Sequence, residues 1–154
     1  MSKTLLAAAL AALLWIPAAA LAQSPSPDYD PALARLVGAD EHGMRNYVLV
    51  VLKTGPTRVP AGPGRDAMFK GHFANMSRLA AEGKLALAGP FDGSEGWRGL
   101  FIFAVPTIEE AKQLVATDPV VMQGEMVPEF HPYYGSAALM LVNDAHAKVA
   151  QKRF

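Results

Sequence analysis

The sequence contains no cysteine among its 154 residues. Disulfides, thiolate nucleophiles and cysteine-ligated metals are therefore excluded, and stability must come from packing. The chain also lacks an excess of either charge, because 14 basic and 14 acidic residues cancel. This balance predicts no nucleic-acid partner. The length and the hydrophobic content of 51% suit one compact domain.

Several motifs that carry chemistry are missing as well. The four histidines are scattered without His-x3-His spacing or a carboxylate cluster, so no metal site is expected. Gly93-Ser94-Glu95 lacks the G-x-S-x-G frame of a nucleophilic serine, and Gly62-x-Gly64 is too short for a dinucleotide fingerprint. We therefore expect no cofactor.

Residues 1–22 have the pattern of a secretory signal peptide. Lys3 supplies the positive start, residues 5–14 the apolar core, and Ala20-Leu21-Ala22 the small-x-small cleavage site. Pro17 leaves the apolar segment short of the roughly 20 residues that span a membrane. We expect cleavage after Ala22, a periplasmic or secreted protein, and no stable membrane insertion after cleavage.

The rest of the chain divides by composition into a lead-in, a domain and a tail. The lead-in, residues 23–45, is rich in serine and proline and is expected to be a spacer. Its apolar trio Leu33, Leu36 and Val37 is compatible with one amphipathic turn. Residues 46–134 form the predicted domain, and residues 135–154 form a tail for which a terminal helix is expected.

Four strands are predicted in the domain from runs of β-branched and aromatic residues bounded by turn residues. Pro128 and Pro132 place the last strand at a sheet edge, because proline donates no ladder hydrogen bond. The segment 54–64 holds three prolines and three glycines and is predicted to be a long loop. The strands are residues 46–53, 84–89, 97–105 and 125–134, with a turn at 91–96.

Two helices are predicted between these strands. The first is expected to begin at Asp66 as N-cap and to end at Gly83. The second begins at Thr107, with Glu110 completing a capping box. The first helix has an apolar face at helical spacing that includes the imidazole of His72; its members are Phe69, His72, Phe73, Met76, Leu79 and Ala80.

The order strand, helix, strand, strand, helix, strand predicts an α+β, ferredoxin-like split βαβ fold with an antiparallel sheet. Right-handed crossovers place the first and third strands in the centre of the sheet. Helices cover only one face of such a sheet. The apolar central strands therefore predict a homodimer whose sheets pack face to face.

The ordered motifs resemble those of the YciI-like (YCII-related) family. They are His72-x3-Met76-x2-Leu79-x2-Glu82-Gly83-x-Leu85-x2-Ala88-Gly89-Pro90, Asp118-Pro119-x4-Gly124 and His131-Pro132-Tyr133-Tyr134. The resemblance implies a dimeric α+β barrel with an active site built on a His and Asp pair, which falls on His72 and Asp118. It also implies an active-site phosphohistidine or a kinship with small lyases and isomerases. The export signal and the long loop depart from the family pattern.

Each candidate residue also has a structural interpretation. A lone histidine on an apolar face is often packed core, and Asp before Pro commonly caps a short helix. His131 either lines the pocket mouth or belongs to the wet face of an edge strand. Arg98, like Arg65, is a candidate for binding an anionic substrate. Trp97 is a candidate pocket wall or dimer contact.

We therefore expect an exported enzyme that binds a small molecule and uses His72 and Asp118 for lyase- or isomerase-like acid–base chemistry. Substrate-binding roles are predicted for His131, Arg98 and Trp97. A non-catalytic ligand-binding or interaction module on the same dimeric scaffold is the alternative. Haem binding is a third possibility, because other dimeric α+β barrels hold haem through a histidine.

Overall fold

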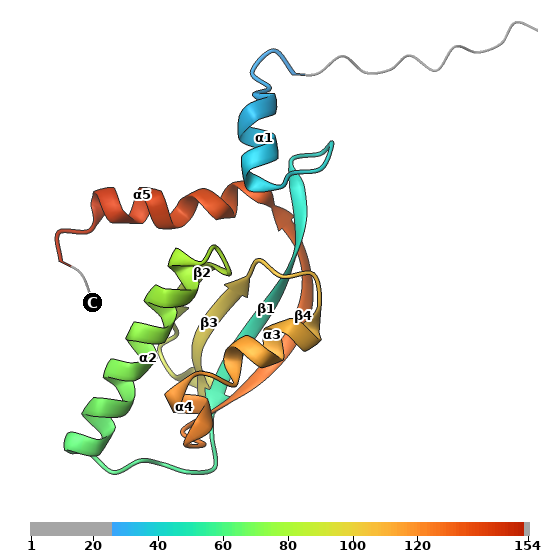
Figure 1. Ribbon diagram of the computed structural model, residues 1–154. Coiled ribbons are helices and arrows are strands. Elements are labelled where there is room, and N and C mark those ends of the chain that lie inside the picture. The colour runs from blue at the N-terminus through green and yellow to red at the C-terminus, as the bar shows by residue number, and fades with distance from the viewer. Residues whose placement is uncertain (1–25, 153–154) are drawn as a thin grey trace, which may run out of the picture.

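The computed structural model describes residues 26–152, so the predicted signal peptide lies outside the described residues. Figure 1 shows helices in front of a curved sheet. In chain order the elements are α1 (Pro31–Val37), β1 (Met44–Thr54), α2 (Pro63–Ala81), β2 (Leu85–Pro90), the 3₁₀ helix η1 (Ser94–Gly96), β3 (Trp97–Phe103), α3 (Ile108–Val115), α4 (Pro119–Met122), β4 (Met126–Ser136), the 3₁₀ helix η2 (Ala137–Leu141) and α5 (Val142–Val149).

The four strands form one antiparallel sheet in the order β2-β3-β1-β4. This confirms the predicted α+β, ferredoxin-like fold, with the first and third strands in the centre. The proline-containing strand β4 lies at an edge, as predicted from Pro128 and Pro132. It pairs with β1 over eleven residues, from Met44 opposite Ser136 to Thr54 opposite Met126.

The main core lies between the sheet and its helices. Val48, Val50 and Leu52 alternate along β1 and point to this side, where they meet Phe101 and Phe103 of β3. Helices α2 and α3 contribute buried residues to the same core. They include Met68, Leu79, Ala111 and Val115. Side chains on the inward side of α2 therefore pack against this covered face of the sheet.

The opposite face of the sheet, called here the open face, carries a smaller apolar cluster. Tyr47 and Ile102 belong to it, and by alternation Leu49, Val51 and Leu100 lie on the same face. Leu139 and Met140 of η2 pack against this cluster, and Asn143 of α5 donates a hydrogen bond to the Leu85 carbonyl over 2.8 Å. Helix α5 is the terminal helix that was expected in the tail.

Three local features differ from expectation. Helix α2 begins at Pro63 after Gly62, so the predicted Asp66 N-cap is wrong, and Asp66 lies in the first turn. Proline suits this position because its φ is preset and its missing N–H has no helical acceptor. Phe73 leaves 39% of its surface exposed, because it sits at the rim of the apolar face. The lead-in contains a two-turn helix, α1, capped by Asp30.

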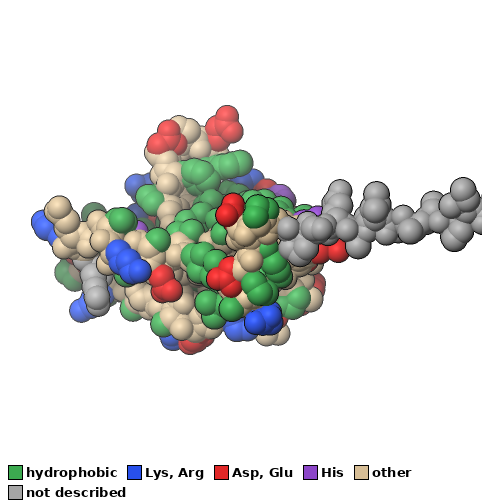
Figure 2. All heavy atoms as spheres, turned by 90° about the horizontal axis from the view of Figure 1, so that it is seen from above, with side chains coloured by type: hydrophobic (Ala, Val, Ile, Leu, Met, Phe, Trp, Pro, Cys, Tyr) green, Lys and Arg blue, Asp and Glu red, His purple; other side chains and the backbone are tan. Residues whose placement is uncertain are grey.

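Helix α1 and α5 lie at one end of the molecule, which Figure 2 views from above. Hydrophobic side chains gather over the middle of this end, with acidic and basic side chains interspersed around them. Leu33 and Leu36 of α1 are among the exposed hydrophobic residues. No helix within residues 26–152 combines the length and apolar character that crossing a membrane requires.

Candidate functional site: a buried histidine–aspartate pair

His72 and Asp118 form a hydrogen-bonded pair, although 46 positions separate them in the chain. The Nδ1 atom of His72 lies 2.9 Å from Oδ1 and 2.8 Å from Oδ2 of Asp118. The side chain of Asp118 is 1% exposed and that of His72 is 10% exposed. The sequence motifs predicted these two residues as partners, and the structure brings them together.

Local structure explains where each partner sits. His72 lies on the inward side of α2, between Met68 and Leu79 of the core. Asp118 is the N-cap of α4, and its Oδ1 accepts a hydrogen bond from the Val120 N–H over 3.1 Å. The carboxylate therefore caps the helix and holds the imidazole at once, since two oxygens offer enough lone pairs for both.

A close contact between α2 and α4 allows this pairing. A Cβ atom added at Gly71 would lie 2.9 Å from Cγ of Pro119, the residue after Asp118. Beside this contact, Thr117 Oγ1 donates to Asn75 Oδ1 over 3.1 Å, which ties the turn before Asp118 to α2. Both features fix the distance between the two site residues.

The imidazole is enclosed by aromatic rings but is not sealed. The ring of Phe101 stacks against it at 6.0 Å between centroids, and those of Phe73 and Phe69 lie at 5.3 Å and 6.1 Å. Nε2 has no hydrogen-bond partner within residues 26–152. In that part of the chain, the only fully buried side-chain nitrogen or oxygen without a partner is Nε of Arg45. Nε2 of His72 therefore reaches solvent.

This geometry sets the chemistry of the pair. An ionised carboxylate only accepts hydrogen bonds, so Nδ1 of His72 carries the proton that faces Asp118. In the neutral ring, Nε2 then holds the lone pair, and it is the nitrogen with solvent access. The pair can accept a proton at Nε2, and Asp118 stabilises the imidazolium that results.

A second charged group lies at the amino-terminal end of α2. Glu125 has a side chain that is 1% exposed, and its Oε1 lies 2.8 Å from Nη1 of Arg65 and 3.7 Å from Nη1 of Arg98. Its Oε2 accepts from the Val59 N–H over 2.7 Å. Burial alone raises the pKa of Glu125, but these donors outweigh it and the pKa lies below its usual value.

The other predicted site residues lie elsewhere. His131 is on the open face of β4, where its Nε2 is 2.8 Å from Oε1 of Glu129, and Lys53 pairs with the same carboxylate. The ring of Trp97 packs edge-on against Phe91 at 5.4 Å, where the β2–β3 hairpin turns. Neither side chain contacts the His72–Asp118 pair, so their substrate-binding roles stay predictions.

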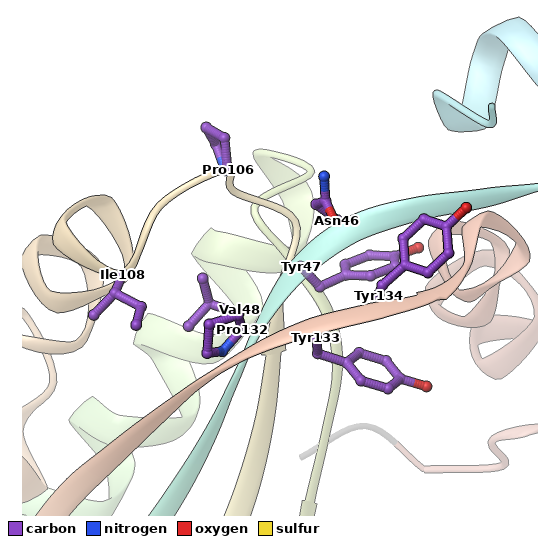
Figure 3. A pocket seen from close by; sticks show the side chains of 8 residues that line it. All are labelled: Asn46, Tyr47, Val48, Pro106, Ile108, Pro132, Tyr133 and Tyr134. Carbon is purple, nitrogen blue, oxygen red and sulfur yellow. The ribbon is translucent and has the colours of Figure 1, made fainter.

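A cleft of about 270 Å³ lies at the end of the β1–β4 pair where Asn46 is opposite Tyr134 (Figure 3). Apart from Asn46 its lining is apolar or aromatic, and tyrosines are its only titratable side chains. Eight residues form it: Asn46, Tyr47, Val48, Pro106, Ile108, Pro132, Tyr133 and Tyr134. It does not include His72 or Asp118. Sequence reasoning missed this cleft, although the Pro132-Tyr133-Tyr134 run was a visible signal.

Within the described range 26–152, no three histidine, aspartate or glutamate side chains come together as a set that would hold a metal ion. The pair of His72 and Asp118 by itself offers two ligands, fewer than the four of a structural zinc site.

Comparison with known proteins assigns the chain to a family. Residues 46–128, more than half of the chain, match the YCII-related domain, and the chain belongs to this family. Both His72 and Asp118 lie within the matched residues. Over 54 residues the chain is also 35% identical to the uncharacterized protein YjpA of Bacillus subtilis (strain 168). That match covers 35% of this chain and 61% of YjpA, less than two thirds of the relative.

Proposed function

We propose that this protein is an enzyme in which His72 moves a proton on a small organic substrate and Asp118 orients the imidazole. One observation carries the proposal: Nδ1 is held by a buried carboxylate while Nε2 reaches solvent. A histidine that only filled space in the core would not need a carboxylate to fix its ring while Nε2 stays without a hydrogen-bond partner in the described part of the chain. The reaction class is a lyase or isomerase reaction that begins with proton abstraction next to a carbonyl.

The chemistry follows from the two nitrogens. Nε2 takes a proton from the substrate carbon, and the imidazolium that forms is stabilised by Asp118 through Nδ1–H. Returning the proton to a different carbon completes an isomerisation, whereas expelling a leaving group completes an elimination. Phe69, Phe73 and Phe101 keep the surroundings apolar, which strengthens the attraction between imidazolium and carboxylate.

The proposal is tested by deuterium exchange, which detects proton abstraction before the full reaction is known. The protein is incubated in D₂O with cyclohexanone or 4-oxopentanoate, and loss of the α-proton signals is followed by NMR. Exchange faster than in buffer is expected. General acid–base catalysis contributes about 10²–10⁴-fold, so His72→Gln should lose at least about 100-fold. Equal exchange by wild type and His72→Gln contradicts the proposal.

A second candidate function is ligand binding without catalysis, and the cleft in Figure 3 favours it. Its tyrosine and proline lining suits a flat apolar molecule. Titration with phenol, followed by amide NMR shifts, separates the candidates. Shifts confined to Asn46, Val48 and Ile108, together with no deuterium exchange at any ketone, favour the binding function.

Two further properties belong to the proposed function. We propose that the chain is exported and acts after removal of residues 1–22, because the sequence there has the three regions of a signal peptide. The intact mass of protein recovered from the periplasm of a bacterial host tests this, with Gln23 as the expected first residue. We also propose that the active form is a homodimer that pairs the open faces of two sheets.

A further inference from the structure

Two arginines share one carboxylate at the amino-terminal end of α2. Arg65 comes from the first turns of α2 and Arg98 from β3, and both approach Oε1 of Glu125. Because they converge on the same oxygen, the two guanidinium groups are neighbours. The group therefore carries two positive charges against one negative charge.

The contacts of the two arginines are unequal. Nη1 of Arg65 donates to the Val59 carbonyl over 2.9 Å and pairs with Glu125. Arg98 stands 3.7 Å from the carboxylate, beyond hydrogen-bond distance, and its side chain makes no hydrogen bond within residues 26–152. With 23% of its side chain exposed, Arg98 keeps its donors open to solvent.

Anchoring the loop between β1 and α2 explains only part of the contacts among Arg65, Arg98 and Glu125. Glu125 and Arg65 hold Val59 by its N–H and its carbonyl, which anchors the loop between β1 and α2. That role is complete without Arg98. A second guanidinium beside a satisfied pair is repelled by Arg65, and an incoming anion relieves that repulsion.

The arginines adjoin the His72 site along one side of α2. The guanidinium of Arg65 lies over the ring of Phe69, 4.9 Å from its centroid. Phe69 in turn meets the ring of His72 edge-on at 6.1 Å. His72 follows Arg65 by seven positions along the helix, a rise of roughly 10 Å, which matches the length of a small organic molecule.

We propose that Arg98, with Arg65 and Glu125, is an anion subsite that binds the carboxylate of a substrate whose apolar part lies against Phe69 and reaches His72. This inference rests on the proposed function and names its substrate class, small organic carboxylates. Glu125 orients the pair, and the spare donors of the guanidinium groups match the two oxygens of a carboxylate.

The test uses benzoate, which joins a carboxylate to a flat apolar ring, and benzamide as the matched neutral probe. Binding to the full domain is measured by NMR titration. Benzoate is expected to bind at least tenfold more tightly than benzamide. Arg98→Met should weaken benzoate binding about tenfold or more and leave benzamide unchanged, whereas Arg98→Lys should recover part of the affinity.

Arg58→Met is the control, because Arg58 is an exposed residue of the neighbouring loop and its loss removes the same charge. An equal loss of benzoate affinity in Arg58→Met overturns the subsite, as does equal binding of benzoate and benzamide or no benzoate binding at all. If Arg98→Met fails to fold, nuclear Overhauser contacts in the wild-type complex decide. Contacts from benzoate to Phe69 and Arg98 support the subsite, and their absence overturns it.

Binding needs no turnover, so the two proposals fail separately. Arg98-dependent benzoate binding without deuterium exchange removes the acid–base function and keeps the subsite. Deuterium exchange that depends on His72, without preference for the carboxylate probe, keeps the function and removes the subsite.

Discussion

Asp118 has two roles at the residue scale, and they can be separated by substitution. Its carboxylate caps α4 through the Val120 N–H and accepts the Nδ1 proton of His72. Asparagine is as good an N-cap as aspartate. Its amide, however, also offers a donor, which allows Nδ1 of His72 to become the acceptor.

We predict that Asp118→Asn folds normally but shifts the neutral ring of His72 toward the tautomer with the proton on Nε2. The ring ¹⁵N chemical shifts measure this directly. The rate at which the ketone's α-protons exchange for deuterium should fall with the tautomer change, because the nitrogen facing solvent no longer has a lone pair. Asp118→Ala should lose the cap as well, at a cost of about 1 kcal/mol. Unchanged ring shifts in Asp118→Asn would refute the proposed orientation.

Gly71 allows α2 and α4 to approach closely because it has no side chain. We predict that Gly71→Ala moves Pro119 and Asp118 away from His72, because the new Cβ would lie 2.9 Å from Cγ of Pro119. Overpacking costs about 1–3 kcal/mol, while the better helix propensity of alanine returns up to about 1 kcal/mol. The expected result is net loss of stability and exchange activity, measured by urea unfolding and by NMR.

Gly64→Ala is the matched control for this substitution. Gly64 lies in the same helix, and a Cβ there meets nothing within 4 Å. Gly64→Ala should therefore keep or raise stability and leave exchange unchanged. If both variants behave alike, the contact with Pro119 does not set the position of Asp118.

The sequence predicted the His72–Asp118 pair but not the arrangement around Glu125. His72 falls in phase with the apolar residues of α2, and the resemblance of the ordered motifs to the YCII-related family implied Asp118 as its partner. Glu125 follows Gly124 at the expected start of a strand, where a charged residue is ordinarily solvated. Its burial depends on Val59, Arg65 and Arg98, which come from three other segments. Local sequence patterns do not show that residues from separate segments contact one another.

At the scale of elements, the loop between β1 and α2 is held by its contacts with the segment before β4. Gly55 donates to the Glu125 carbonyl over 2.8 Å, and Thr57 donates to the Gly124 carbonyl over 3.1 Å. A Cβ at Gly55 would come within 2.1 Å of the latter oxygen. The predicted loop is thus ordered by backbone contacts that required glycine at this position.

We predict that Glu125 makes the fold acid-sensitive. Burial raises the pKa of Glu125, but Val59, Arg65 and Arg98 outweigh burial, and in the folded protein this pKa lies below the ordinary glutamate value of 4.5. Its stabilisation is therefore complete above that value and is lost as pH falls through the lower folded pKa. Glu125→Gln should unfold more easily at pH 7, by about 2 kcal/mol, since it loses charge-assisted hydrogen bonds.

Urea unfolding from pH 7 to pH 3 measures this effect. The stability difference between wild type and Glu125→Gln should shrink as the pH falls below about 4.5. Glu109→Gln is the control, because Glu109 is exposed in the first turn of α3 and forms no ion pair with residues 26–152. A difference that stays constant with pH would show that the charge of Glu125 does not stabilise the fold.

The element order was predictable and the element ends were less so. The apolar runs predicted all four strands, and the prolines placed β4 at an edge. The longer β1–β4 pairing, from Met44 to Ser136, was not visible because its ends are polar or glycine-rich. Helix α2 begins at Pro63, earlier than the cap pattern at Asp66 indicated, because proline presets the helical φ and leaves one N–H fewer without an acceptor.

At the scale of the whole molecule, we predict that a charge on the open face separates the proposed dimer. Leu100 lies in the centre of that face, between its β1 and β2 partners Val51 and Gly89. Leu100→Glu should give a monomer by light scattering, because an unpaired charge is costly to bury in an apolar interface. Leu36→Glu, on exposed α1, should stay dimeric. A monomeric wild type would refute the prediction.

The histidine and the aspartate belong to different halves of the fold. His72 lies in the unit made of β1, α2 and β2, and Asp118 lies in the unit made of β3, α3, α4 and β4. The two units meet at the hairpin turn that contains η1. A chain cut at this turn would therefore divide the pair between two fragments. Recovery of proton transfer on mixing them would then report fragment complementation, with the chemistry as its readout.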